Sequence, residues 1–132
     1  DRLSRQFVAA IAKDKKLEST NSAFISAFAN AEIKVQPLTL TLDNGTEFLG
    51  FKELEKELGI KVYFADSHSP WQRGSNENIN GLVRFFFPRG TDFNKVTQEQ
   101  LDAVVSLINN RPRKCLGFLS PNEFLKKVLH LA

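Results

Sequence analysis

Two alternating segments with a helical segment between them constrain the fold more than any other feature of this sequence. Residues 38–42 (Leu-Thr-Leu-Thr-Leu) and 60–64 (Ile-Lys-Val-Tyr-Phe) place apolar side chains at every second position, which is typical of strands with one face on a core. Between them, apolar residues recur at helical spacing over 51–58, and Gly59 follows as a C-cap. Strand, helix and strand in this order predict an α/β fold with helices packed on a mixed sheet.

Further elements are expected on both sides of this unit. Residues 6–12 have the pattern of a strand, and a helix with N-cap residues at 20–22 follows it. Another helix is expected to begin near Ser75 and to end before Pro88. The capping-box pattern at Thr97 and the Ser-Pro pair at Ser120 predict two more helices.

The length and composition are those of an ordinary globular domain. The chain has 132 residues, 42% hydrophobic and 25% charged, so we expect one domain, with a sheet-and-helix core over 1–87 and C-terminal helices over 88–132. No stretch approaches the roughly 20 apolar residues that span a bilayer, and no signal peptide is recognisable. These features predict a cytoplasmic protein with no membrane partner, in which Cys115 is a reduced thiol.

Charge is distributed unevenly along the chain. Residues 84–132 carry 8 Lys/Arg against 4 Asp/Glu, whereas residues 1–83 carry 10 against 11. The positive field is therefore expected in the C-terminal third, where it favours an anionic partner. The sequence contains no methionine, which suggests an excised or processed piece.

Two acids, Asp43 and Glu77, are the candidates for chemistry. Asp43 follows a strand and precedes an Asn-Gly turn, and Glu77 falls in the first turn of a helix. The carboxyl edge of an α/β sheet is where such folds place reactive groups, and paired carboxylates suit magnesium. Each acid also has a purely structural interpretation, Asp43 as a turn residue and Glu77 as a partner of the helix dipole.

Four sequence motifs resemble those of a known family. They are Leu42–Phe48 (LDNGTEF), His68–Asn78 (HSPWQRGSNEN), Arg111–Gly117 (RPRKCLG) and Ser120–Glu123 (SPNE). Together they resemble the catalytic core of bacterial insertion-sequence transposases, in particular the insertion-sequence-thirty family of the retroviral-integrase superfamily. The resemblance covers nearly the whole chain and implies a ribonuclease-H-like fold.

The resemblance also implies an activity. Members are DDE enzymes, in which an Asp-Asp-Glu triad binds two Mg²⁺ or Mn²⁺ ions, and they cleave transposon ends and join them to target DNA. Asp43 matches the second aspartate and Glu77 the glutamate, while the first aspartate and the first strand or strands of the fold have no match in this chain. Asp1, Asp14 and Asp66 are poor substitutes. We therefore expect weak metal binding and no joining activity from this chain alone.

Several polar residues near these acids are candidate DNA contacts. They are Arg73, Asn80, Arg84, Arg111, Arg113 and Lys114, with Asn44 and His68 as accessory residues. Cationic side chains can hold phosphate oxygens and so position DNA without reading its sequence. Solvated surface charge and helix-end charge are the alternatives for these residues, and a structural role is the alternative for His68.

The resemblance and the unpaired sheet edge also predict partners, and two other functions stay open. DNA is the expected partner, in the bacterial nucleoid, and an unpaired sheet edge favours a homo-oligomer. One rival is a ribonuclease-H-type nuclease acting on RNA in hybrids. The other is a non-catalytic remnant that binds DNA or associates with a full-length transposase.

Overall fold

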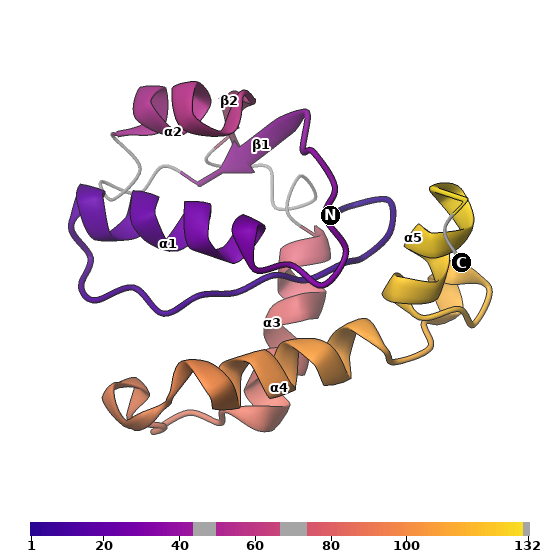
Figure 1. Cartoon of the computed structure of the whole chain (residues 1–132). Helices are drawn as coiled ribbons and strands as arrows, with labels where there is room; N and C mark the ends of the chain where they lie inside the picture. Colours follow the sequence, from indigo (N-terminus) through magenta and orange to yellow (C-terminus); the bar gives the residue numbers. More distant parts are fainter. Residues whose placement is uncertain (44–49, 67–73, 131–132) are drawn as a thin grey trace. The chain divides into compact units, whose positions relative to one another are not determined.

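The chain forms two compact units. The structure, a computed structural model, describes residues 1–43, 50–66 and 74–130 (Figure 1). One unit is Ala10–Gly74, and the other combines Asp1–Ala9 with Ser75–Ala132. In chain order the elements are α1 (Leu17–Ala29), β1 (Thr39–Leu42), α2 (Phe51–Leu58), β2 (Lys61–Phe64), α3 (Gly74–Phe86), the 3₁₀ turn η3 (Phe93–Lys95), α4 (Gln98–Asn109), the 3₁₀ turn η4 (Lys114–Leu116) and α5 (Pro121–Val128).

The sheet of the 10–74 unit is a parallel pair. β1 and β2 pair with Leu40 opposite Val62 and Leu42 opposite Phe64. Parallel strands need a crossover between them, and α2 lies in that connection, so the predicted strand–helix–strand order and the α/β class are confirmed. The described residues contain this one pair, and the antiparallel pairing that a mixed sheet requires is not among them.

A small apolar core stabilises this unit. Leu42, Ile60 and Val62 are buried together. Partly buried side chains from α1, β1 and α2 pack against them: Phe24, Leu40, Phe51 and Leu58. Gly59 ends α2 with φ of 64°, a left-handed conformation that glycine adopts without steric cost. The C-cap predicted from the sequence is therefore confirmed, and it turns the chain from α2 into β2.

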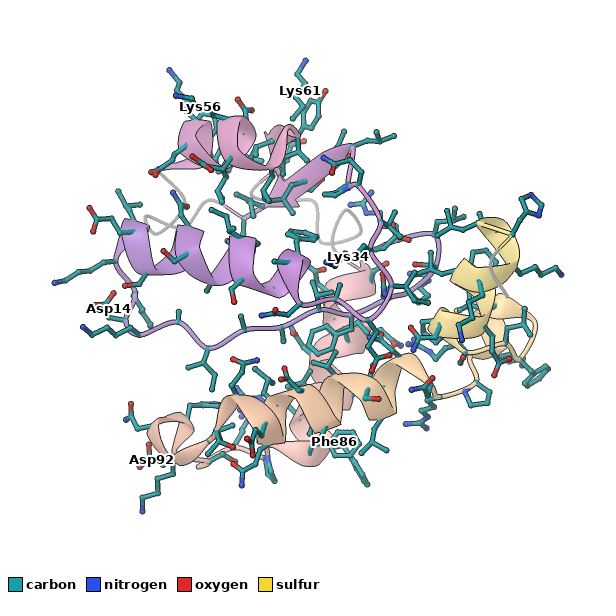
Figure 2. The ribbon with its side chains drawn as sticks, in the orientation of Figure 1. Asp14, Lys34, Lys56, Lys61, Phe86 and Asp92 are labelled. Atoms are coloured by element: carbon teal, nitrogen blue, oxygen red, sulfur yellow. The ribbon has the colours of Figure 1, made fainter. Side chains whose placement is uncertain are left out.

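Helix α1 begins earlier than the sequence pattern indicated. The expected N-cap was at residues 20–22, but the helix begins at Leu17 and its N-cap, Lys16, makes no side-chain capping bond. Asp14, on the chain just ahead of α1 (Figure 2), accepts a hydrogen bond from the Lys16 N–H at 2.9 Å. The Ser19 hydroxyl and then this backbone bond hold the pKa of Asp14 below its usual value. The Asp14 carboxylate thus organises the chain where the helix starts.

Asn21, one of the expected caps, instead links α1 to α2. Its side chain is 4% exposed, and its Nδ2 donates to the Gly50 carbonyl at 3.2 Å and to the Glu53 carboxylate at 3.4 Å. A Cβ added to Gly50 would lie 3.1 Å from that nitrogen. The close approach of the two helices therefore depends on an asparagine on one and a glycine ahead of the other.

The strand predicted over residues 6–12 is not formed, because a side chain takes the place of its partner strand. The Phe7 N–H donates to Oδ1 of Asn109 at 2.8 Å, and Nδ2 of Asn109 donates to the Phe7 carbonyl at 2.8 Å. Asn109 is 1% exposed. These bonds fix the segment Asp1–Ala9 to the end of α4, within the unit that contains residues 75–132.

The helix starts predicted in the C-terminal part are confirmed. Thr97 caps α4 in a complete capping box with Gln100, the two backbone-to-side-chain bonds measuring 3.1 and 3.0 Å. Ser120 caps α5 by accepting from the Glu123 N–H at 3.1 Å, with proline at the first helical position. Within the described ranges, none of these helices is both long and apolar enough to cross a bilayer.

Candidate functional site

Asp43 lies at the carboxyl end of the parallel strand pair. It follows directly on Leu42, which is 5% exposed and whose carbonyl accepts from the Ala65 N–H at 2.7 Å, just beyond β2. The Asp43 side chain is partly buried, and its Oδ1 atom is buried. The strand-end position predicted for this acid is confirmed, and it is the kind of position at which α/β sheets bind ligands.

Glu77 lies in the first turn of α3, as predicted, with its side chain exposed. A carboxylate is favoured there by the helix dipole. Asn80 and Arg84 follow it at i+3 and i+7 and are also exposed, whereas the predicted apolar stripe is half-buried: Ile79, Leu82, Val83 and Phe86. The helix therefore has the polar face expected of it, with Glu77 at one end and Arg84 near the other.

Two arginines contact the turn that carries Glu77. Arg5 donates to the Ser75 hydroxyl, and Nη2 of Arg113 donates to Oδ1 of Asn78 at 2.5 Å. The sequence assigned Arg113 to DNA, but the structure places its guanidinium on the residue next to Glu77. Arg5 was missed altogether. Its partner is 70 positions away, and no periodic pattern connects residues at that distance.

The other basic residues between α4 and α5 are on the surface. Arg111 and Lys114 are both exposed. Their predicted role in DNA binding stays a prediction. Asn44, His68 and Arg73 lie outside the described residues.

Asp43 and Glu77 are each described within their own unit. Asp43 belongs to residues 10–74 and Glu77 to the unit that includes residues 75–132. Among the described residues, no three His, Cys, Asp or Glu side chains gather into a group that could hold a metal ion. The donor type nevertheless fits, since carboxylate oxygens are the ligands that magnesium prefers.

Of the three acids that were judged poor substitutes for a first aspartate, two accept hydrogen bonds that organise the local chain, and the third lies on the surface. Oδ2 of Asp1 accepts from the backbone N–H and the hydroxyl of Ser4, at 2.7 and 2.6 Å. Asp14 organises the start of α1. Asp66 is exposed two residues beyond β2.

The fold is that of an integrase catalytic core. The chain superposes on the catalytic core domain of BIV integrase with a TM-score of 0.68 and 20% identity, covering 97% of this chain and 82% of that one. This likeness confirms the ribonuclease-H-like fold class expected from the sequence. No protein-family model matches the chain.

The sequence relatives of the chain are transposases of insertion sequence elements. The chain is 42% identical over 132 residues to the transposase for insertion sequence element IS1086 from Cupriavidus metallidurans, covering 98% of this chain and 38% of the relative. It is 41% identical over 127 residues to transposase InsI for insertion sequence element IS30A from Escherichia coli K12, covering 96% and 33%. The chain is a homologue of these insertion-sequence-thirty-family transposases and spans about a third of their length.

Proposed function

We propose that Asp43 and Glu77 are two of the three carboxylates of a DDE metal site, in a protein that cleaves transposon ends and joins them to target DNA. One observation carries the proposal. In a chain 41–42% identical to transposases, the acid of one family motif follows a strand whose last residue, Leu42, is buried, and the acid of the other occupies the first turn of a helix.

The two carboxylates would hold Mg²⁺ or Mn²⁺, as oxygen ligands do for such hard cations. When bound, a pair of these ions activates the attacking hydroxyl and stabilises the leaving oxygen in phosphoryl transfer. Asp43 would act from the end of β1 with one oxygen shielded from water, and Glu77 from an exposed helix turn. A two-ion site needs a further acid, so this chain alone should not join DNA ends.

DNA is the proposed partner, held chiefly through its phosphates. Arg84 and Asn80 lie along the same exposed face of α3 as Glu77, and Arg111 and Lys114 are exposed in the basic segment between α4 and α5. With Arg73, these residues would position the backbone and make binding fall with salt. We also propose action on DNA in the bacterial nucleoid and assembly as a homo-oligomer. Each strand of the β1–β2 pair leaves one edge open in the described part.

The test uses the complete transposase that contains this chain, with Asp43→Asn and Glu77→Gln made separately. Metal ions stabilise such transition states by several kcal/mol, and about 1.4 kcal/mol corresponds to tenfold in rate. Each change should therefore lower joining of transposon ends by at least about 100-fold, with DNA affinity nearly kept. Asp66→Asn, beyond the neighbouring strand end, is the matched control and should keep most of the activity.

Two results would contradict the proposal. Joining that survives loss of either carboxylate removes the metal role. Cleavage of RNA in hybrids, with no joining of transposon ends, would instead favour a ribonuclease-H-type nuclease on the same fold.

A further inference from the structure

Arg5 reaches the first turn of α3 from a segment that is fixed at several points. Its backbone has φ of 61°, which is rare for a residue with a side chain and costs of order 1–3 kcal/mol. Ser4, just before it, is fully buried and accepts from the Gln6 N–H at 3.2 Å. Phe7, just after, is fixed by both hydrogen bonds to Asn109. The guanidinium that donates to Ser75 is therefore carried by a constrained loop.

Arg113 contacts the same turn, and its backbone is also fixed by hydrogen bonds. Its N–H donates to the Leu119 carbonyl at 3.0 Å, and its carbonyl accepts from Leu116 and Phe118 at 3.0 and 2.9 Å. The Nη2 atom of Arg113 donates to Asn78. The Nη1 atom is buried and has no hydrogen-bond partner among the described residues. A guanidinium placed in this way is poorly exposed for gripping a DNA phosphate.

Two cations at the start of a helix are electrostatically unfavourable by themselves. The N-terminal end of a helix carries a partial positive charge, and a cation near it costs about 0.3–1 kcal/mol. Glu77 is the acidic residue of that turn, and it lies in sequence between Ser75 and Asn78, the two residues that the arginines contact. The arrangement is explained if the two arginines fix the helix turn that carries the Glu77 carboxylate.

We propose that Arg5 and Arg113 are positioning residues for Glu77, each holding one side of the first turn of α3 through a side-chain hydrogen bond. The inference rests on the proposed function in taking Glu77 as the metal ligand. Groups that orient a ligand in this way typically change metal affinity by about 10–100-fold when they are removed. This role replaces the DNA contact that the sequence suggested for Arg113.

The test is an NMR measurement on the 132-residue chain. The backbone order parameter of Glu77 is compared in the unaltered chain, Arg5→Gln, Arg113→Gln and the double variant, with Arg89→Gln as a control that removes an exposed charge elsewhere. In the variants of Arg5 and Arg113, we expect the order parameter of Glu77 to fall from a rigid value of about 0.85 towards the mobile range below about 0.6. Arg89→Gln should leave this order parameter unchanged. Mn²⁺ titrations followed at the Glu77 signal should show affinity lowered about tenfold in the arginine variants.

Asn78 supplies a second route to the same answer if an arginine variant fails to fold. Asn78 is exposed, so Asn78→Ala removes the acceptor without opening the core. Asn78→Ala should lower the order parameter of Glu77 as much as Arg113→Gln does. Combining the two changes should lower it little further, as expected when both remove one shared interaction. Asn78→Asp keeps an acceptor and should preserve the order at Glu77.

The failures of the two proposals are separable. An unchanged Glu77 order parameter in the double arginine variant, with the chain folded, overturns the positioning role. Lack of any Mn²⁺ effect on Glu77 in the unaltered chain contradicts the metal role instead, and the order-parameter comparison still decides whether the arginines hold the turn.

Discussion

Asn109 shows how one side chain can replace an element of secondary structure. Its amide donates to and accepts from the backbone of Phe7, as a neighbouring strand would. Phe7, Val8 and Ile11 among alanines suggested a strand over residues 6–12, and an extended segment can have this composition whatever satisfies its backbone. Nothing in the local sequence indicates that the partner is an asparagine 102 positions away.

Asn109→Ala is predicted to destabilise the chain strongly. It leaves the part-buried N–H and carbonyl of Phe7 without partners, at about 1–3 kcal/mol for each group, so the free energy of unfolding should fall by about 2–6 kcal/mol. The measurement is the urea midpoint with its slope. Asn30→Ala is the matched control, because Asn30 is exposed and its side chain donates to Ser26 of α1, the helix that Asn30 ends. Equal effects of the two changes would show that the Phe7 bonds contribute little.

The candidate site was predictable for the residues whose position is set locally. Asp43 follows a strand and Glu77 starts a helix, and both positions follow from patterns within a few residues of each acid. The contacts of Arg5 and Arg113 could not be predicted, because they join residues 70 and 35 positions apart. Such contacts depend on how whole elements pack, which periodicity does not specify.

At the scale of elements, caps were predicted well where the capping bonds close within one turn. Thr97 with Gln100 and Ser120 with Glu123 are such cases, and both are observed. The start of α1 was wrong because Asn21 is buried against Gly50 and does not cap. A residue of the capping type is ambiguous when a tertiary contact competes for its side chain.

Thr97→Ala should lower the free energy of unfolding by about 1 kcal/mol, the usual value for loss of an N-cap. Both bonds of the capping box would be affected, since Gln100 loses the partner that aligns it. Thermal unfolding followed by circular dichroism measures the change, and Thr97→Ser, which keeps the hydroxyl, should restore most of it. A serine variant as unstable as the alanine variant would show that the hydroxyl bond is not the cause.

At the scale of the whole molecule, the alternation over residues 38–64 was enough to predict the α/β class and its strand–helix–strand unit. The division of the chain into two compact units was not predictable from such local patterns. Residues 1–9 group with residues 75–132, far along the chain, because Phe7 bonds to the buried Asn109 and Arg5 bonds to Ser75. Sequence patterns describe elements, whereas packing between distant segments decides which of them share a unit.

The most direct test of the central claim is whether Asp43 and Glu77 bind one divalent ion together. Mn²⁺ is titrated into the isotope-labelled chain, and the paramagnetic broadening of backbone signals is followed beside both acids. A shared ion predicts that both sites broaden with the same apparent Kd, and that Asp43→Asn weakens the effect at Glu77 while Asp66→Asn does not. Separate Kd values, or an effect at Glu77 that is indifferent to Asp43→Asn, would contradict the account.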